Sequence, residues 1–229
     1  MWKGDDRMSG RDVFEGRQFQ ALLFDMDGTI LTSILAAERV WTRWALRHGL
    51  DPVRVLATIH GKRSVDSVRA LALPGVDAQA ESDWITAAEI EDVEGIQPVP
   101  GAAEFLAGLP DGRWAVVTSA PRLLAERRIA AAGLPQPPMM ISAEDVSVGK
   151  PAPDGYRLAA GRLGWAATSC LVFEDAPAGI AAGEAAGAAV VVITAAHASP
   201  STTPHPAFAD YRGLVTRTAT AGVALLRRS

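Results

Sequence analysis

Two carboxylates stand one residue apart near the beginning of the chain, in the segment LLFDMDGTI. Asp25 and Asp27 directly follow an apolar run that is typical of a buried strand, and Gly28 permits the chain to turn there. One carboxylate of such a pair can bind a metal ion and attack phosphorus, since carboxylates form aspartyl-phosphates. The other can protonate the leaving oxygen and then activate a water molecule. A solvated turn after a strand is the alternative interpretation of the two acids.

Polar side chains also follow two later apolar runs. Thr118 and Ser119 come at the end of WAVVTS, and Glu174 and Asp175 follow CLVF. Because the functional groups of a doubly wound sheet lie beyond the carboxyl ends of its strands, we expect these side chains to share one rim with the first acid pair. Carboxylates packed together repel one another and need a cation, and Mg²⁺ suits oxygen ligands of this kind. A helix N-cap followed by a first-turn acid is the alternative for Glu174 and Asp175.

Lys150 completes the candidate site. It lies in GKPAPDGY, a loop bounded by Gly and Pro from which its ammonium group can reach the same rim. A cation, a lysine and two hydroxyl groups that converge on one point form an anion site, most simply for a phosphoryl group. A surface lysine beside a Pro-rich turn is the alternative interpretation.

The elements that must position these groups alternate between apolar runs and helical patterns. Continuous apolar runs predict strands buried on both faces of a parallel sheet, at 21–24, 114–118, 170–173 and 189–194, with 138–141 as a weaker candidate. Helices are predicted between them, at 101–108, 121–132, 153–163 and 177–186. This alternation predicts an α/β fold with a Rossmann-like, three-layer core around a doubly wound parallel sheet.

The interval after the first motif breaks this alternation. It lacks a clear strand pattern and predicts four helices, at 34–48, 52–58, 64–73 and 77–91. We therefore expect an α-helical module at 33–97, inserted into a core domain made of 18–32 and 98–229. Residues 1–17 are expected to be a flexible N-terminal extension. From residue 197 onward the chain is rich in Pro, Ser and Thr and then ends in a helix-like stretch.

Composition limits the classes of function. The chain has 229 residues, 48% of them hydrophobic, which suffices for one sizeable core with an inserted module. The net charge of −4 gives no general attraction for nucleic acid. We expect no membrane partner, because no apolar run reaches the ~18 residues that span a membrane and the polar N-terminus lacks the apolar region of a secretory signal. The single cysteine, Cys170, allows no internal disulfide, so the expected compartment is the cytoplasm.

Four segments together resemble the motifs of the haloacid dehalogenase-like hydrolase superfamily, in order and in spacing. They are FDMDGT, VVTSA, GKPAPDGY and VFEDAPAGIAAG. The resemblance covers the chain from about residue 19 and implies that the helical insertion is the cap that follows the first motif in this superfamily. It is strongest to the phosphatases of small sugar and polyol phosphates, such as glycerol phosphate or 2-deoxyglucose 6-phosphate. Many relatives carry an acid followed by Ser or Thr just after the first motif, where this chain has Thr32 and Ser33.

The resemblance implies roles for the four acids. Asp25 is implied to be the nucleophile and a Mg²⁺ ligand. Asp27 is implied to be the general acid and base, with its backbone carbonyl on the metal. Asp175 is implied to bind the metal directly, and Glu174 to bind it through water.

The resemblance also implies which groups hold the phosphoryl oxygens. Lys150 is implied to neutralise both the nucleophile and the phosphoryl group. A hydroxyl group of Thr118 or Ser119 is implied to bind the phosphoryl oxygens together with a neighbouring backbone N–H, and the sequence does not select between the two residues.

A polar, cationic loop lies between two predicted helices of the cap. It comprises His60, Gly61, Lys62 and Arg63. We expect this loop to close over the site and to contact the part of the substrate that is not phosphate. A solvated turn, with Gly61 ending a helix, is the alternative interpretation.

These observations predict a phosphoric monoester hydrolase that acts on a small phosphorylated metabolite, a sugar or polyol phosphate, through an aspartyl-phosphate intermediate. We expect a monomer or a weak dimer. One alternative is a phosphosugar mutase of the β-phosphoglucomutase kind, which passes the phosphoryl group to a sugar instead of water. A non-enzymatic alternative is a catalytically silent protein that binds a phosphorylated metabolite. A haloacid dehalogenase fits less well. The resemblance associates that reaction with the same fold lacking the second acid of the first motif, whereas Asp27 is present in this chain.

Overall fold

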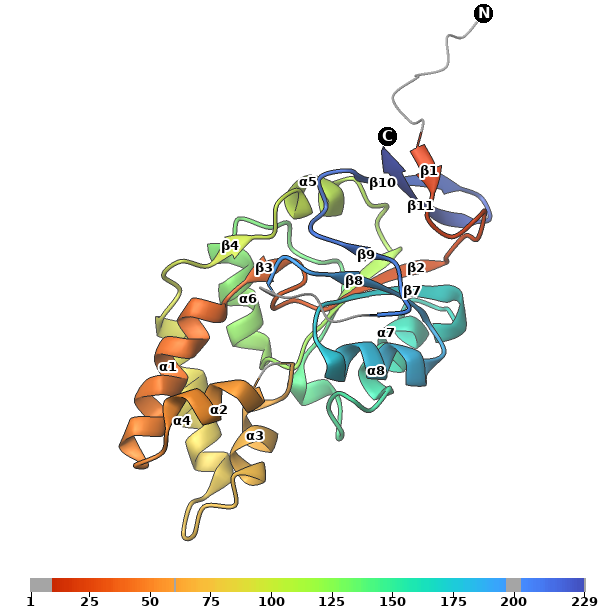
Figure 1. Ribbon diagram of the computed structural model, residues 1–229. Helices are drawn as coiled ribbons and strands as arrows, with labels where there is room; N and C mark the ends of the chain where they lie inside the picture. The colour runs from red at the N-terminus through yellow and green to blue at the C-terminus, as the bar shows by residue number, and fades with distance from the viewer. Residues whose placement is uncertain (1–9, 60, 197–202, 229) are drawn as a thin grey trace, which may run out of the picture.

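A six-stranded parallel sheet forms the centre of the protein, in the order β6-β5-β2-β7-β8-β9 (Figure 1). The computed structural model describes residues 10–59, 61–196 and 203–228. The strands are β2 (Ala21–Phe24), β5 (Trp114–Val117), β6 (Met140–Ile141), β7 (Cys170–Glu174), β8 (Ala189–Ile193) and β9 (Ala207–Phe208). The five strands expected from the sequence are confirmed. Because β2 lies between β5 and β7, the carboxyl ends of three motif-bearing strands are neighbours.

Helices cover both faces of this sheet because its strands carry apolar side chains on both sides. Along β2, the side chains of Leu22 and Phe24 belong to one core and those of Ala21 and Leu23 to the other. The first core is covered by α5 (Ala102–Ala107) and α6 (Arg122–Ala131), and the second by α7 (Asp154–Arg162) and α8 (Pro177–Ala186). The predicted three-layer, Rossmann-like α/β core is therefore confirmed.

The helices between the first two motifs form a module with a core of its own. They are α1 (Ile34–Arg47), α2 (Pro52–Ile59), α3 (Ser64–Ala70) and α4 (Ala78–Glu91). Their buried side chains pack on one another: Val40, Trp41, Trp44, Ala45, Val55, Ile59, Val68 and Ile85. The chain enters and leaves the module through β3 (Leu31–Thr32) and β4 (Gln97–Pro98), which pair antiparallel. We propose on this basis that 33–97 is a cap domain on a core made of 18–32 and 98–229.

Two expectations about the ends of the chain are wrong within the described residues. Residues 10–17 are not a loose extension, because β1 (Gly10–Asp12) pairs antiparallel with β11 (Gly222–Arg228). The end of the chain is not helical, because β10 (Leu214–Ala219) and β11 form a hairpin. The periodicity of a short apolar run does not separate a strand from a helix, and here burial on the sheet's core selects the strand. Residues 1–9 lie outside the described part of the chain.

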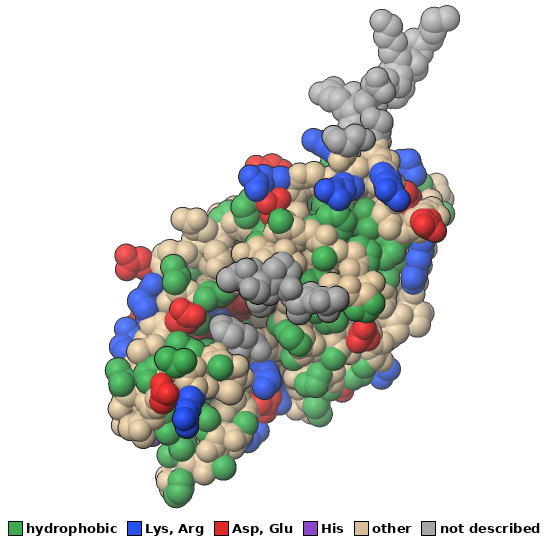
Figure 2. All heavy atoms as spheres, viewed as in Figure 1, with side chains coloured by type: hydrophobic (Ala, Val, Ile, Leu, Met, Phe, Trp, Pro, Cys, Tyr) green, Lys and Arg blue, Asp and Glu red, His purple; other side chains and the backbone are tan. Residues whose placement is uncertain are grey.

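The surface carries charges of both signs. On the face drawn in Figure 2, Lys and Arg side chains are interspersed with Asp and Glu side chains, in keeping with the net charge of −4. Within the three described ranges, no helix combines the length and the apolar character needed to cross a membrane. Cys170 is buried and not part of a disulfide.

Candidate active site

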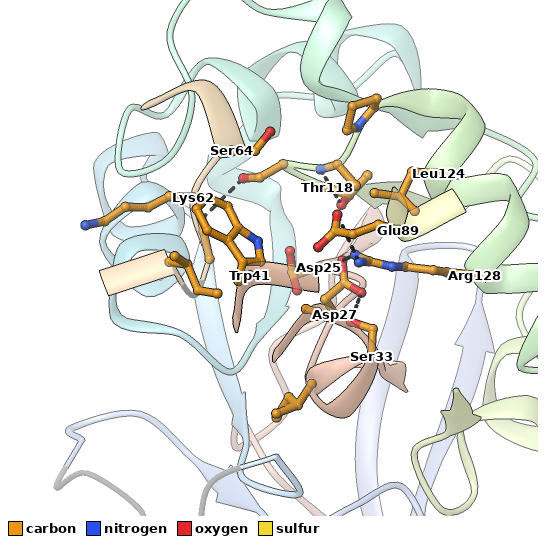
Figure 3. Close-up of a pocket in the computed structure, with 17 residues that line it drawn as sticks. Asp25, Asp27, Ser33, Trp41, Lys62, Ser64, Glu89, Thr118, Leu124 and Arg128 are labelled. Carbon is orange, nitrogen blue, oxygen red and sulfur yellow. Dashed lines mark hydrogen bonds and ion pairs between the residues drawn. The ribbon is translucent and has the colours of Figure 1, made fainter. Parts of the chain in front are cut away.

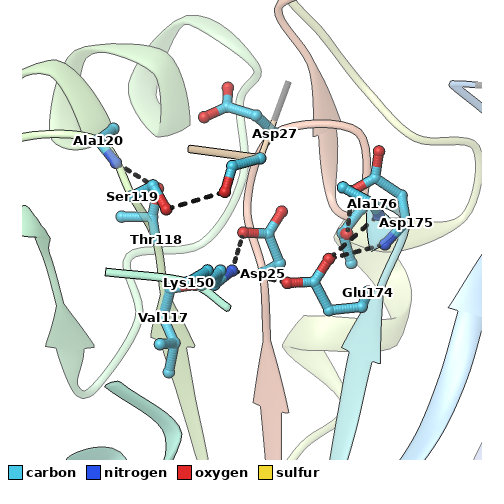
Figure 4. Close-up of polar contacts among 12 residues, drawn as sticks. Asp25, Asp27, Val117, Thr118, Ser119, Ala120, Lys150, Glu174, Asp175 and Ala176 are labelled. Carbon is cyan, nitrogen blue, oxygen red and sulfur yellow. Dashed lines mark hydrogen bonds and ion pairs between the residues drawn. The ribbon is translucent and has the colours of Figure 1, made fainter. Parts of the chain in front are cut away.

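Asp25, Lys150 and Glu174 meet at the carboxyl ends of the central strands (Figure 4). Asp25 follows β2, and its backbone N–H donates to the carbonyl oxygen of Phe173 at 2.9 Å, which fixes it beside β7. Nζ of Lys150 lies 2.5 Å from Oδ1 of Asp25 and 2.7 Å from Oε1 of Glu174. It also donates to the carbonyl oxygen of Val117 at 3.1 Å. The lysine therefore connects the ends of β2, β5 and β7, as the sequence predicted for one shared rim.

Asp175 extends this group to three neighbouring carboxylates. Oxygen atoms of Asp25, Glu174 and Asp175 all lie within 4.8 Å of one another. Burial raises the pKa of Asp25; the charge of Lys150 opposes this rise, and the two other acids add to it. Burial alone would lower the pKa of Lys150, but the charges of Asp25 and Glu174 outweigh this effect and raise it. Three carboxylates grouped in this way repel one another, and their oxygen atoms suit a hard divalent cation.

Two glycines make room for these acids. Gly28 has a φ of +90°, and a Cβ atom there would lie 2.1 Å from Oδ2 of Asp175. A Cβ atom on Gly179 of α8 would lie 1.6 Å from Oε1 of Glu174. Both separations are far below van der Waals contact, so any larger residue at either position displaces an acid of the site.

Hydrogen bonds orient the carboxylate of Glu174 on both of its oxygens. The hydroxyl group of Tyr156 donates to Oε1 at 2.7 Å. The backbone N–H groups of Asp175 and Ala176 donate to Oε2 at 3.0 and 3.3 Å. Glu174 is 1% exposed, so these contacts and Lys150 hold it in one orientation.

Asp27 faces the cap side of the site (Figure 3). Its Oδ1 accepts a hydrogen bond from the hydroxyl group of Ser33 at 2.5 Å, and its Oδ2 accepts one from Nη1 of Arg128 at 3.0 Å. Arg128 belongs to α6 and is 5% exposed. Its Nη2 lies 3.3 Å from Oε2 of Glu89 on α4, in the cap. Burial raises the pKa of Glu89 even though the charge of Arg128 opposes this.

Thr118 and Ser119 follow β5 and have different partners. Thr118 is buried, and its Oγ1 accepts a hydrogen bond from the backbone N–H of Ala120 at 3.0 Å. The hydroxyl group of Ser119 donates to the carbonyl oxygen of Gly61 in the cap at 3.2 Å. The first hydroxyl group is thus held within the core, and the second connects the core to the cap.

A cavity of about 110 Å³ lies between the cap and the core. Its lining includes residues of both parts: Asp25, Asp27, Thr118 and Arg128 from the core, and Trp41 and Glu89 from the cap. The candidate nucleophile and the candidate acid therefore line the same cavity.

The described residues of the cap loop, which was expected to contact substrate, lie in different places. Gly61 and Lys62 line the cavity, although the Lys62 amine points away from Asp25 in Figure 3. Arg63 pairs with Asp66 at 2.6 Å and donates to the carbonyl oxygen of Ser147 at 3.2 Å, so it connects the cap to the core outside this cavity. His60 lies outside the described residues.

Reasoning from the sequence missed Glu89, Arg128 and Tyr156. Glu89 and Arg128 could have been noticed in the sequence, because each is a charged residue on the apolar face of a predicted helix. Arg128 lies on the same face of α6 as the buried Ile129 and Leu124. Such a residue needs a buried partner, but the sequence does not say which one.

Known proteins resemble this chain in sequence and in fold. The sequence model of the haloacid dehalogenase-like hydrolase family matches residues 19–187. Hexitol phosphatase A of Escherichia coli (strain K12) is 43% identical over 192 residues, which cover 81% of this chain and 86% of that protein. 2-Deoxyglucose-6-phosphate phosphatase 2 of Saccharomyces cerevisiae is 34% identical, over 76% of this chain and 80% of that protein. The crystal structure of a hydrolase from Pseudomonas syringae has a TM-score of 0.71 and 24% identity, over 79% of this chain and 87% of that one, and supports the fold.

Proposed function

Because the chain belongs to the haloacid dehalogenase-like hydrolase family, we propose that it is a Mg²⁺-dependent phosphatase of a small sugar or polyol phosphate. The observation that carries the proposal is the 2.5 Å contact between Asp25 and Lys150 beside two further carboxylates. Asp25 also lines the cavity that Asp27 lines. The names of the two relatives at 43% and 34% identity, a hexitol phosphatase and a 2-deoxyglucose-6-phosphate phosphatase, support this class of substrate.

The proposed metal site uses the acids at the ends of β2 and β7. Asp25, Asp175 and the backbone carbonyl of Asp27 would hold the ion, and Glu174 would bind it indirectly. Three carboxylates within 4.8 Å of one another, against one lysine, fit a divalent cation and support this assignment. When bound, Mg²⁺ supplies positive charge that neutralises the nucleophile and the phosphoryl oxygens.

The proposed reaction has two steps. In the first, a carboxylate oxygen of Asp25 bonds to phosphorus, the bond from phosphorus to the ester oxygen breaks, and Asp27 gives its proton to that oxygen. In the second, Asp27 takes a proton from water, the water oxygen bonds to phosphorus, and inorganic phosphate leaves Asp25. Lys150 and the hydroxyl group of Thr118 hold the phosphoryl oxygens throughout. The contribution of the protein is mainly positioning and charge neutralisation.

The cap has a separate part in this proposal. Trp41 and Ile59 bring apolar surface to the cavity opposite the core acids. With the cap closed, this surface excludes bulk water while the first step takes place, and opening of the cap releases the product. All of these groups come from one chain, so we propose that a monomer suffices for activity.

The test is phosphate release from a panel of hexitol, hexose, polyol and nucleoside monophosphates, with and without Mg²⁺. We expect turnover of one or a few sugar or polyol phosphates that requires Mg²⁺ and is abolished in Asp25→Asn. A sugar phosphate that is isomerised without release of phosphate would instead indicate a mutase. Saturable binding of these phosphates without any conversion would indicate a silent binding protein.

A further inference from the structure

A continuous series of contacts leads from the cap to the candidate general acid. Glu89 of α4 lies 3.3 Å from Nη2 of Arg128, and Nη1 of the same guanidinium lies 3.0 Å from Oδ2 of Asp27. The hydroxyl group of Ser33, the residue just before α1, contacts the other oxygen of Asp27 at 2.5 Å. Both oxygens of Asp27 are therefore held by groups that are connected to the cap (Figure 3).

Arg128 is the only member of this series that is anchored in the core and contacts both other charged residues among those described. It is 5% exposed, and Glu89 is 7% exposed, whereas the side chain of Asp27 is 29% exposed toward the cavity. Burying a guanidinium group costs free energy unless acids compensate it, and an apolar residue fills the face of a helix without that cost. The burial of Arg128 is therefore explained by its ion pairs with Asp27 and Glu89 and not by the packing of α6.

The two ends of the guanidinium group are held unequally. Nη1 makes a hydrogen bond to Asp27, whereas Nη2 and Nε of Arg128 lack a hydrogen-bond acceptor among the described residues. The contact with Glu89 is thus an ion pair across the cap–core boundary, and a small movement of α4 changes it without breaking the bond to Asp27. Arg128 therefore contacts the candidate general acid on one side and a residue of the cap on the other.

We propose that Arg128 is a positioning residue that orients Asp27 toward the leaving oxygen, and that Glu89 couples this orientation to the position of the cap. This inference rests on the proposed phosphatase function. It adds two residues outside the four sequence motifs to the machinery for proton transfer.

The test compares two substrates that differ in their need for a proton on the leaving group. An alkoxide, as from sorbitol 6-phosphate, must be protonated, whereas the nitrophenolate of p-nitrophenyl phosphate leaves without a proton. The quantity compared is kcat/KM, which reports the first step alone, because the second step, in which Asp27 activates water, is common to both substrates. In Arg128→Gln we expect kcat/KM for sorbitol 6-phosphate to fall about 10–100-fold and kcat/KM for p-nitrophenyl phosphate to fall less than about threefold. Asp27→Asn provides the reference, because it removes the acid itself and should show the same selectivity to a greater extent.

Glu89→Gln tests the cap side of the proposal without emptying a buried position. We expect a smaller loss, about 3–10-fold, again confined to sorbitol 6-phosphate. The double variant should lose little more than Arg128→Gln alone, because the two residues act through one contact. Arg127→Gln and Glu91→Gln are matched controls, since both side chains are exposed on the same two helices and should keep wild-type kcat/KM for both substrates.

Two results would overturn the proposal. Equal losses on both substrates in Arg128→Gln would show that the arginine supports the fold or binds the phosphoryl group. Wild-type kcat/KM on both substrates in Arg128→Gln and in Glu89→Gln would show that Asp27 needs neither of them. Thermal unfolding shows whether each variant is folded at the assay temperature. If Arg128→Gln is not, the comparison of the two substrates is made with Glu89→Gln and Arg128→Lys instead. Failure of the proposed function has a different signature, since wild-type protein would then release no phosphate from either substrate.

Discussion

Gly179 of α8 faces Glu174 so closely that a Cβ atom on the glycine would lie 1.6 Å from Oε1 of the acid. The same oxygen accepts hydrogen bonds from Lys150 and Tyr156. The bare backbone of one helical position therefore sets where a carboxylate of the site lies, and through Lys150 it also affects Asp25.

Gly179→Ala should accordingly impair both activity and stability. The methyl group must displace Glu174 or α8, and we expect kcat to fall at least about tenfold and the free energy of unfolding to fall by about 1–3 kcal/mol. Gly161→Ala is the matched control, because Gly161 is also helical and a Cβ atom there meets open space. That variant should gain about 0.4–1 kcal/mol. Urea denaturation and phosphate release check both variants, and equal behaviour of the two would contradict the role of Gly179.

Removing the charge of Lys150 should leave Asp25 and Glu174 without the ammonium group that both contact. In Lys150→Met we expect kcat to fall by at least about 100-fold, because a preorganised charge opposite the phosphoryl group is lost. Breaking a buried ion pair from one side costs about 3–5 kcal/mol, so the apo protein should also unfold at lower urea concentration. Lys150→Arg restores the charge with a different shape and should recover part of the stability but little of the activity. Retention of kcat within about tenfold in Lys150→Met would contradict the assignment.

Metal binding should be visible without any substrate. A ligand that binds only the folded protein stabilises it, by about 2.7 kcal/mol at 100 times its dissociation constant. We therefore expect Mg²⁺ to raise the Tm of the wild-type protein, EDTA to reverse the rise, and Asp175→Asn to abolish most of it. Asp210→Asn, which changes an acid outside the carboxylate cluster, should keep the rise. An undiminished rise in Asp175→Asn would place the ion elsewhere.

The rim of the sheet could be predicted from the sequence because it follows from topology alone. Once β2, β5 and β7 are recognised as parallel strands, the residues after them must meet at one edge, and Asp25, Thr118 and Glu174 do so. The sequence did not provide the contacts that depend on docking. Glu89 and Arg128 lie 39 residues apart in the chain, on two helices whose packing is decided by the whole cap.

The ends of the chain show a second limit of sequence reasoning. The run Val223–Leu226 is apolar throughout, and such a run is compatible with a buried strand as well as a helix. Its pairing with β1 joins residues more than 200 positions apart, and no local pattern encodes that contact. The strand becomes evident only when the core beneath it, which includes Phe19 and Val223, is assembled.

The different partners of Thr118 and Ser119 predict different kinetic effects. The hydroxyl group of Thr118 is buried in the core at the end of β5, where we expect it to bind a phosphoryl oxygen, so Thr118→Val should lower kcat at least about tenfold. The hydroxyl group of Ser119 bonds to Gly61 of the cap, so Ser119→Ala should weaken closure and raise KM with little change in kcat. Steady-state kinetics on the best substrate of the panel separates the two effects. The reverse pattern would assign the phosphoryl contact to Ser119.

Asp145, in the 3₁₀ turn Ala143–Asp145, predicts a dependence of stability on pH. The backbone N–H of Ser142 donates to its Oδ2 at 2.9 Å, and Arg122 lies 2.8 Å from the same oxygen. These contacts, the backbone hydrogen bond first, hold the pKa of Asp145 below its usual value. A carboxyl group with a lowered folded-state pKa stabilises the protein fully above its unfolded-state pKa, about 3.9, and loses that effect as the pH falls through the folded-state value.

Asp145→Asn should therefore cost about 1–2 kcal/mol of the free energy of unfolding at pH 7. The difference in the free energy of unfolding between wild type and variant should stay constant down to about pH 5. It should narrow below about pH 4, because protonation then removes the charge of the wild-type carboxyl group. Urea denaturation at a series of pH values measures this difference. Asp111→Asn, an exposed acid in the loop before β5, serves as the control and should stay within about 0.5 kcal/mol of wild type throughout. If this difference in the free energy of unfolding is unchanged at about pH 3, the variant is destabilised by its altered hydrogen bonds and not by the loss of charge. Asp145 would then not be one of the groups that make stability depend on pH.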